Sequence, residues 1–508
     1  MNLKNMIETI RKYCSNPGKV FSIALATALF ATLCCTLFLS DIYRDTAHVY
    51  AVYAREIGNG NWQAGIVTRA PMFNITLAGL LAYCGLEAVK ALTLVAGLFY
   101  LATCFPLRKL LERYVSPLAA AWGCLLYAAA PKMIRFACAP LLESTRIFFL
   151  ISAVLYFLRT AEDPKWKNAI LFGLSAGFLS VSRGEGLAVS AALLLGLPFF
   201  VLLFRRPANW GKQAVMWVIA MTCAFAATTP FCAMNYSKSG YFVQDARLIG
   251  ITENMLVRFF GQPQKKGQAA TTQPTGGFVS YSNDLSEKKT ISHDISSFIR
   301  GSYELYFMLA LVGIVLMFRN KRWKSDYLLF AGVAILQCLI YMVTISALRY
   351  YLFMIPLFMM FTVTGADWVR QQVIKYVPGK LHILCAIGCA VLLAGQIANG
   401  VSRAFSSKGK DFQAAGKWIK EYGEKKFPDR KLIIFAPGMT ETAYWSGAIH
   451  TDGYENVQHD PATFKDFDLA VVHRKRSHGM ENRTDLERIP NTPHSKNIWI
   501  FKVKKQEE

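Results

Sequence analysis

Residues 20–39 read VFSIALATALFATLCCTLFL, an unbroken apolar run that sets the class of the fold. A helix of about 20 residues is long enough to cross the hydrocarbon core of a bilayer. Because Lys4, Arg11, Lys12 and Lys19 precede the run, the positive-inside rule predicts an N-terminus in the cytoplasm. The run is longer than the apolar region of a usual cleaved signal peptide, and we interpret it as an uncleaved first transmembrane helix.

The composition of the chain is typical of a membrane protein. Of its 508 residues, 53% are hydrophobic and only 18% are charged, yet the formal net charge is +23. A nucleic-acid-binding protein would not dilute such a charge in so much apolar sequence, so no nucleic-acid partner is expected. The same composition excludes a disordered chain and a disulfide-stapled secreted scaffold. Positive charge within apolar sequence indicates short basic loops between membrane-spanning helices.

Ten further apolar runs and the loops between them predict the topology. Basic loops separate alternate pairs of runs, and the positive-inside rule places these loops in the cytoplasm. Residues 72–86 are short for a crossing, and we interpret them as an interfacial or re-entrant helix on the outer side. The basic loops are 108–113, 159–167, 205–212, 319–326 and 367–380. The ten runs lie near 91–107, 117–138, 146–158, 169–182, 187–204, 214–232, 305–318, 327–346, 350–366 and 382–400.

The predicted fold is therefore a polytopic α-helical membrane protein with about eleven crossings. Its N-terminus lies inside and its C-terminus outside the cytoplasmic (inner) membrane, so that the tail is periplasmic. Three regions then lie outside: the loop 40–90, the loop 233–303 and the tail 403–508. We expect a transmembrane catalytic domain over 1–402 and a small extracytoplasmic α/β domain over 403–508.

The α/β prediction for the tail rests on four segments. DFQAAGKWIKEYGEKK (411–426) has the spacing of an amphipathic helix. KLIIFA (431–436), FDLAVVH (467–473) and NIWIFKVK (497–504) are typical of strands.

Ionisable residues at membrane depth gather on the outer side of this topology. Charges there are costly, which makes them candidates for function. A carboxylate can deprotonate an incoming nucleophile and cations can stabilise a phosphate leaving group, as group transfer from a membrane-embedded anionic donor requires. We favour function for Asp45, Arg183 and Arg349. A structural role, as paired or snorkelling charges, is the better interpretation for Arg55, Glu56 and Arg146.

Asp45 stands where a helix is expected to begin, since apolar and aromatic residues follow it at helical spacing. An N-cap is its structural interpretation. A cap alone does not explain a carboxylate directly after a crossing and beside Asp41 and Arg44, and the two roles are compatible.

Several short motifs follow Asp45 in a fixed order and on the same predicted side. They are YAVYAREIGNGNW (50–62), Ala70-Pro71, PLLES (140–144), SVSRGEGL (180–187) and LRYYLFMIPLF (348–358). In this order they resemble the GT-C superfamily of membrane glycosyltransferases, in the bacterial branch related to protein O-mannosyltransferases and to the aminoarabinose transferase that modifies lipid A. AAGKWIKE and TAYWSG in the tail are similar to the extracytoplasmic domain of these enzymes.

The resemblance implies a catalytic site in the first outer loop. Members of the family transfer a sugar, with inversion, from a polyprenyl-phosphate donor to an extracytoplasmic acceptor. The donor lies among the lipids of the membrane. For this chain, the resemblance leaves a lipid, a glycan or a protein as the acceptor. Carried over by position, Asp45 is the catalytic base, with Asp41 as its substitute. Glu143 holds the place of a second acidic motif, which in some members helps to bind the acceptor or a metal.

The same resemblance implies a substrate-binding set around the lipid phosphate and the acceptor. Arg183 and Arg349 would neutralise the phosphate, and the remaining members of the set are Lys132, Arg135, Glu185, Tyr350 and His48. The sequence departs from the family where a frequent Asp-Glu pair is replaced by Asp45-Thr46. We therefore assign no metal ligands. No cofactor is assured, and a divalent metal stays open although nothing in the sequence indicates one.

Two other functions remain open on the sequence. An O-antigen ligase or polymerase also uses lipid-linked sugars outside the cytoplasm, and it would rely on the long loop, with Arg247, Arg258 and His293, rather than on Asp45. A transporter or flippase is a weaker alternative, because the sequence has no internal repeat and its charges are one-sided, whereas alternating access needs polar groups near the midplane.

The segment Gly173-Leu174-Ser175-Ala176-Gly177 matches the nucleophile elbow of hydrolases. It lies inside a predicted crossing with no strand before it, so close helix packing through the two glycines explains it better.

Overall fold

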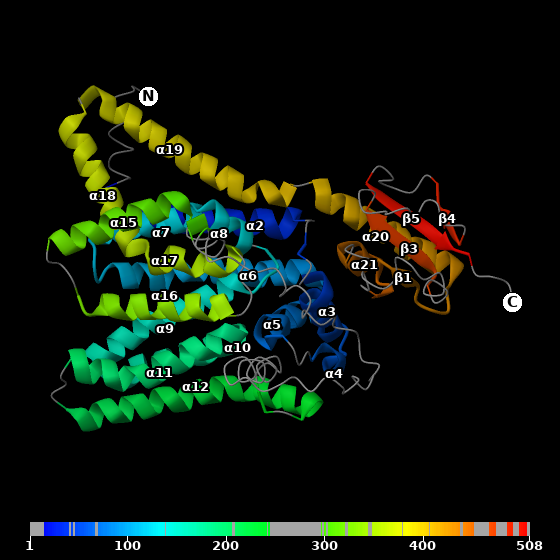
Figure 1. Cartoon of the computed structure of the whole chain (residues 1–508), viewed down its shortest axis with the longest axis horizontal. Coiled ribbons are helices and arrows are strands. Elements are labelled where there is room, and N and C mark those ends of the chain that lie inside the picture. The colour runs from blue at the N-terminus through cyan, green and yellow to red at the C-terminus, as the bar shows by residue number, and fades with distance from the viewer. Residues whose placement is uncertain are drawn as a thin grey trace. The chain divides into compact units, whose positions relative to one another are not determined.

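A computed structural model gives the fold of the chain (Figure 1). The described residues of the chain fall into two compact units, one within 1–37, 53–251 and 289–403 and the other within 38–52 and 404–508. The structure describes residues 15–39, 42–43, 46–66, 70–137, 139–205, 209–240, 242–243, 296, 299–300, 303–320, 324–343, 348–377, 379–405, 407–436, 440–451, 467–473, 485–490 and 497–504.

The first unit is a bundle of long apolar helices that lie side by side (Figure 1). Each apolar run of the sequence is helical, and the breaks fall at charged or Pro/Gly-containing turns; Ser116, for example, accepts a hydrogen bond from Ala119 N and caps the helix that Pro117 begins. The helices are α2 (Pro17–Phe38), α3 (Ala51–Gly58), α4 (Trp62–Gly65), α5 (Met72–Tyr83), α6 (Ala88–Leu111), α7 (Pro117–Ala129), α8 (Pro131–Ala137), α9 (Glu143–Glu162), α10 (Trp166–Ser182), α11 (Gly184–Phe204), α12 (Trp210–Ser239), α15 (Glu304–Arg319), α16 (Asp326–Val343), η3 (Leu348–Phe353), α17 (Met354–Leu357), α18 (Met359–Tyr376) and α19 (Gly379–Val401).

Glycines bring some of these helices into backbone contact. A Cβ atom on Gly173 would lie 2.2 Å from the carbonyl oxygen of Ala220, and one on Gly177 would lie 2.6 Å from that of Ala224. Close packing of α10 on α12 therefore explains the elbow-like motif, as predicted.

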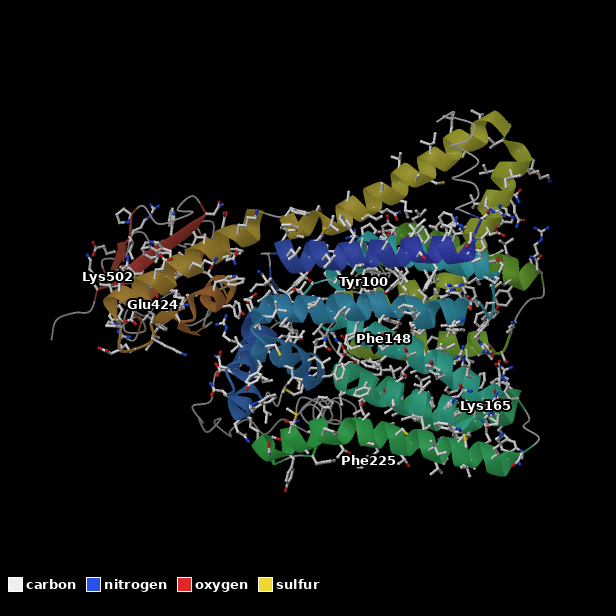
Figure 2. All side chains as sticks on the ribbon, turned by 180° about the vertical axis from the view of Figure 1, so that it is seen from behind. Tyr100, Phe148, Lys165, Phe225, Glu424 and Lys502 are labelled. Carbon is white, nitrogen blue, oxygen red and sulfur yellow. The ribbon has the colours of Figure 1, made fainter. Side chains whose placement is uncertain are left out.

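Side chains fill the spaces between the helices, while large apolar side chains cover the outside of the bundle. Tyr100 and Phe148 lie between helices, whereas Phe225 points away from α12 and is 64% exposed (Figure 2). An outer surface of this kind suits contact with lipid and would be unfavourable in water.

The helix lengths bear on the predicted number of crossings only in part. Among the described residues, five helices are long and apolar enough to cross a membrane, or six if α17 and α18 with the preceding turn, bent by 61°, form one span. Several predicted runs fall short because they end early or are broken, as at Ala130 between α7 and α8. The eleven crossings stay a prediction. α5, with 12 residues, is too short to cross, in line with its predicted status.

A polar cluster joins the helix ends that are predicted to face the cytoplasm. Arg205, directly after α11, donates to Glu162 at 3.1 Å and forms an ion pair with Asp326, the first residue of α16. The hydroxyl of Tyr114 donates to Asp326 at 2.8 Å, and Arg113 pairs with Glu162. Four inter-helix connections are thus tied together at one end of the bundle.

The second unit contains a five-stranded sheet with the order β2-β1-β3-β5-β4. The strands are β1 (Ile433–Phe435), β2 (Ile449–Thr451), β3 (Leu469–His473), β4 (Leu486–Arg488) and β5 (Ile498–Val503). β1 pairs in parallel with β2 and β3, whereas β5 runs antiparallel to β3 and β4. The helices are η1 (Thr46–Tyr50), η4 (Ser402–Phe405), α20 (Ser407–Lys426) and α21 (Thr440–Ser446).

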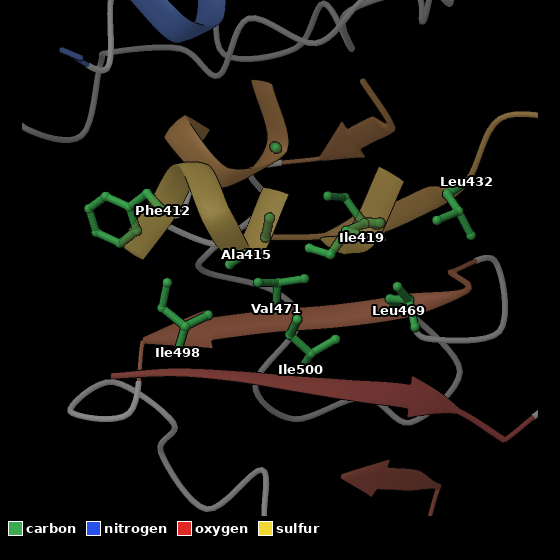
Figure 3. Packing of buried hydrophobic residues seen from close by; sticks show 11 residues of the cluster. Phe412, Ala415, Ile419, Leu432, Leu469, Val471, Ile498 and Ile500 are labelled. Atoms are coloured by element: carbon green, nitrogen blue, oxygen red, sulfur yellow. The ribbon is translucent and has the colours of Figure 1, made fainter. Parts of the chain in front are cut away.

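Alternation along the strands gives this sheet two buried faces. Leu469 and Val471 of β3 pack with Phe412, Ala415 and Ile419 of α20 (Figure 3). The intervening residues of β3, Ala470 and Val472, belong to a separate apolar cluster with Phe501 and Val503 of β5. The predicted amphipathic helix and three predicted strands are confirmed as α20, β1, β3 and β5.

Candidate active site

The turn between α10 and α11 carries the first pair of charges. Arg183 is extended, with φ −167° and ψ 150°, and separates the two helices. Its Nε donates to Glu185 at 3.0 Å, and Glu185 occupies the first turn of α11, where a carboxylate suits the helix dipole. A Cβ atom on Gly186 would lie 2.0 Å from the carbonyl oxygen of Leu179, so this tight turn requires glycine there.

Glu143 joins two arginines from distant segments. It lies in the first turn of α9 and is 3% exposed. Its Oε1 atom accepts a hydrogen bond from Arg183 Nη1 at 2.9 Å and lies 3.5 Å from Nε of Arg349 in η3. A carboxylate held between two guanidiniums is suited to orienting them.

The aromatic ring of Tyr350 contacts the guanidinium groups of the same two arginines. The Cζ atoms of Arg183 and Arg349 lie 4.0 Å and 5.2 Å from the centroid of its ring. Tyr341 of α16 also stacks on Tyr350, with the centroids 5.4 Å apart. Cation–π contacts hold guanidinium planes in place while leaving their N–H donors for other acceptors.

Arg146 connects Tyr350 to α16 through hydrogen bonds. Its side chain is buried, and it donates to Gln337 Oε1 and to the carbonyl oxygen of Tyr350, both at 3.1 Å, and to the hydroxyl of Tyr341. These partners agree with the paired, structural role that we assigned to Arg146. Sequence patterns alone did not single out Gln337 and Tyr341, although a glutamine inside an apolar run was a usable signal.

We call Arg146, Arg183, Arg349, Glu143 and Glu185 the arginine cluster. Three guanidiniums against two carboxylates leave one positive charge (3 − 2 = +1) in a largely buried site. The second carboxylate oxygen of Glu143, Oε2, is buried and has no hydrogen-bond partner among the residues that the structure describes. A site with excess positive charge and stacked guanidiniums is equipped to hold a phosphate.

Two predicted phosphate ligands on α8 have other neighbours. Lys132 pairs with Glu304 at 3.2 Å and donates to the carbonyl oxygen of Arg300. Arg135 is exposed, with its guanidinium 5.8 Å from the ring of Phe136. None of these contacts involves a member of the arginine cluster, and the phosphate-binding role of both residues stays a prediction.

Solved structures with a similar fold include two glycosyltransferases. ArnT from Cupriavidus metallidurans bound to undecaprenyl phosphate superposes with a TM-score of 0.63 at 13% identity, over 94% of this chain and 97% of that one. The Archaeoglobus fulgidus oligosaccharyltransferase in complex with Zn and sulfate superposes with a TM-score of 0.56 at 13% identity, over 89% of this chain and 68% of that one. The chain has the GT-C fold. No protein-family model and no curated protein sequence matches it.

In this GT-C fold, the predicted catalytic segment is described in part. Asp41, Arg44 and Asp45 lie outside the described residues, as does the side chain of His48. The helix expected after Asp45 begins at Thr46, first as the π-helical turn η1 and then as α3. Among the described residues, no group of three or more His, Cys, Asp or Glu side chains is placed to hold a metal ion.

Proposed function

We propose that the chain is a glycosyltransferase that moves a sugar from a polyprenyl-phosphate donor to an acceptor outside the cytoplasm, with inversion. The observation that carries this proposal is the arginine cluster, a buried site with one excess positive charge in a chain with the GT-C fold. The similar ArnT structure has undecaprenyl phosphate bound, which supports a polyprenyl-linked donor for this chain.

In the proposed reaction, Asp45 accepts the proton of the acceptor's hydroxyl group. The acceptor oxygen forms a bond to the anomeric carbon on the face opposite the phosphate, and the carbon–oxygen bond to the phosphate breaks. The electron pair of that bond goes to the departing polyprenyl phosphate, whose charge Arg183 and Arg349 stabilise. Glu143 and Tyr350 hold the two arginines in position.

A cavity between α11 and α16 supports a donor with a long apolar chain. Its volume is about 340 Å³, and its lining is apolar, including Val189, Phe200 and Phe204 on α11 and Leu328, Gly332 and Leu336 on α16. Val189 lies about one helical turn after Glu185, and Leu336 adjoins Gln337, so the cavity begins beside the arginine cluster. The 15 steps from Val189 to Phe204 span about 22 Å of helix, enough for several isoprene units.

Donor consumption tests the proposal. The chain in lipid nanodiscs is incubated with polyprenyl-phosphate-linked sugars extracted from bacterial inner membranes, and release of polyprenyl phosphate is followed by mass spectrometry. Asp45→Asn should abolish release while binding undecaprenyl phosphate as the wild-type chain does. Full activity of Asp45→Asn would exclude Asp45 as the base.

The same assay separates the proposal from an O-antigen ligase or polymerase. Arg247, Arg258 and His293 all lie outside the described residues. If their alanine variants lose activity while Asp45→Asn keeps it, the ligase chemistry is the better description.

A further inference from the structure

The segment that carries Asp45 folds with the C-terminal domain. Residues 38–52 and 404–508 belong to one compact unit, although almost the whole bundle separates them in sequence. Within this unit, the rings of Phe38 and Phe405 stack with centroids 5.2 Å apart. In the same unit, η1 contacts α21, the helix that carries most of the TAYWSG motif.

The faces of α21 show which residue meets η1. A Cβ atom on Gly416 of α20 would lie 2.4 Å from the Cβ atom of Trp445, so that side of α21 lies against α20. Ala443 faces the apolar cluster between α20 and the sheet. At 3.6 residues per turn, Tyr444 points to the remaining side.

Tyr444 is nevertheless only 3% exposed and belongs to neither apolar cluster of the unit. Among the described elements, η1 is the main neighbour of α21 besides α20, and Thr46, Ala47 and Val49 of η1 are buried. Of the elements that the structure describes, η1 is therefore the one best placed to cover the side chain of Tyr444.

The π-helical conformation of η1 bears on the functional importance of its contact with α21. A single π-helical turn such as η1 is rare, and such turns occur frequently at functional sites. Asp45 precedes Thr46 directly in the sequence, so η1 is the described element next to the proposed base.

We propose that Tyr444 is a positioning residue that holds η1, and through it Asp45, in the geometry needed for proton transfer. The C-terminal domain is then part of the catalytic apparatus. This inference rests on the proposed role of Asp45 as the base.

The test compares Tyr444→Ala with Val472→Ala in the full chain in nanodiscs. Val472 lies in the apolar cluster on the opposite face of the sheet, so its variant also removes core volume from the domain but does so without touching α21. Hydrogen–deuterium exchange over residues 46–50 reports on η1, and exchange in β3 and β5 reports on the domain fold. If Tyr444→Ala also exposes β3 and β5, Tyr444→Leu, which keeps most of the apolar volume, takes its place.

Tyr444→Ala should speed exchange over 46–50 and lower kcat for donor consumption by about 10- to 100-fold, with the donor KM nearly unchanged, as expected for a misplaced catalytic group. Tyr444→Phe should restore both values, and Val472→Ala should change neither. Unchanged exchange over 46–50 would overturn the contact, and faster exchange with an unchanged kcat would overturn the positioning role. Activity in Asp45→Asn would instead identify the proposed base as the failed element, because the exchange result does not depend on it.

Discussion

Replacing Arg349 by glutamine gives the sharpest test of the arginine cluster. Arg349 lies 3.5 Å from Glu143, whereas Arg183 lies 2.9 Å from the same oxygen and also pairs with Glu185. Arg349→Gln therefore leaves both carboxylates with their principal partner, and the bundle should still fold. The substitution removes one guanidinium and brings the charge of the cluster from +1 to zero.

The expected loss follows from the chemistry of one contact. A hydrogen bond to a charged group contributes about 1.5–3 kcal/mol, so its loss corresponds to binding about 10- to 150-fold weaker. Arg349→Lys keeps the positive charge but loses the paired N–H donors of the guanidinium and its stacking on Tyr350. Its affinity for the phosphate should therefore fall less, by about 3- to 10-fold.

Titration of the nanodisc-embedded chain with undecaprenyl phosphate measures these changes. Arg108→Gln is the matched control. Arg108 forms an ion pair with Glu112 at a distance of 2.8 Å, and this pair lies at the other end of the bundle. A Kd for Arg349→Gln within about twofold of wild type, where 1.4 kcal/mol would already give tenfold, would show that the cluster does not bind the phosphate.

Three further predictions concern the bundle. Asp326→Asn removes the carboxylate that Arg205 and Tyr114 share. Because Arg205 is 25% exposed, we expect the free energy of unfolding to fall by about 1–3 kcal/mol, which lowers the Tm in detergent. An unchanged Tm would contradict this prediction. Gly332→Phe should fill the cavity between α11 and α16, since a Cβ atom at Gly332 meets open space. We expect it to raise the KM of a full-length donor about tenfold and to leave the KM of a short-chain analogue unchanged. Equal effects on both donors would refute a chain-binding cavity. Gly173→Leu should prevent α10 from packing on α12 and reduce the yield of folded protein, whereas Gly196→Leu, which points into open space, should not; equal yields would contradict the packing argument.

Local patterns in the sequence predicted the helices and the motifs that end them. Long apolar runs became helices because burial and hydrogen bonding act within each run, and SVSRGEGL marked a break because it puts two charges and two glycines into apolar sequence. The sequence also singled out Glu143, Arg183, Glu185, Arg349 and Tyr350, which the structure brings together. Their roles as ligands stay predictions.

The missing information was tertiary. The sequence could not show that Glu143 faces two arginines, because these residues come from three separate connections, and Glu304 gave no sign that it would pair with Lys132. β2 and β4 have three residues each, too few for an alternating pattern. The grouping of residues 38–52 with the C-terminal domain depends on contacts between opposite ends of the chain.

The helices α11 and α16 link the two polar clusters of the bundle, and this arrangement accounts for the cavity between them. At one end, Arg205 after α11 pairs with Asp326 of α16; towards the other, Arg146 bonds Gln337 and Tyr341 of α16, close to the start of α11 at Arg183. Two apolar helices would normally pack until the space between them is filled. Polar contacts at fixed positions near both ends resist that collapse, because each buried charge must keep its partner. We therefore expect the polar contacts near both ends of α16 to help keep this apolar space open.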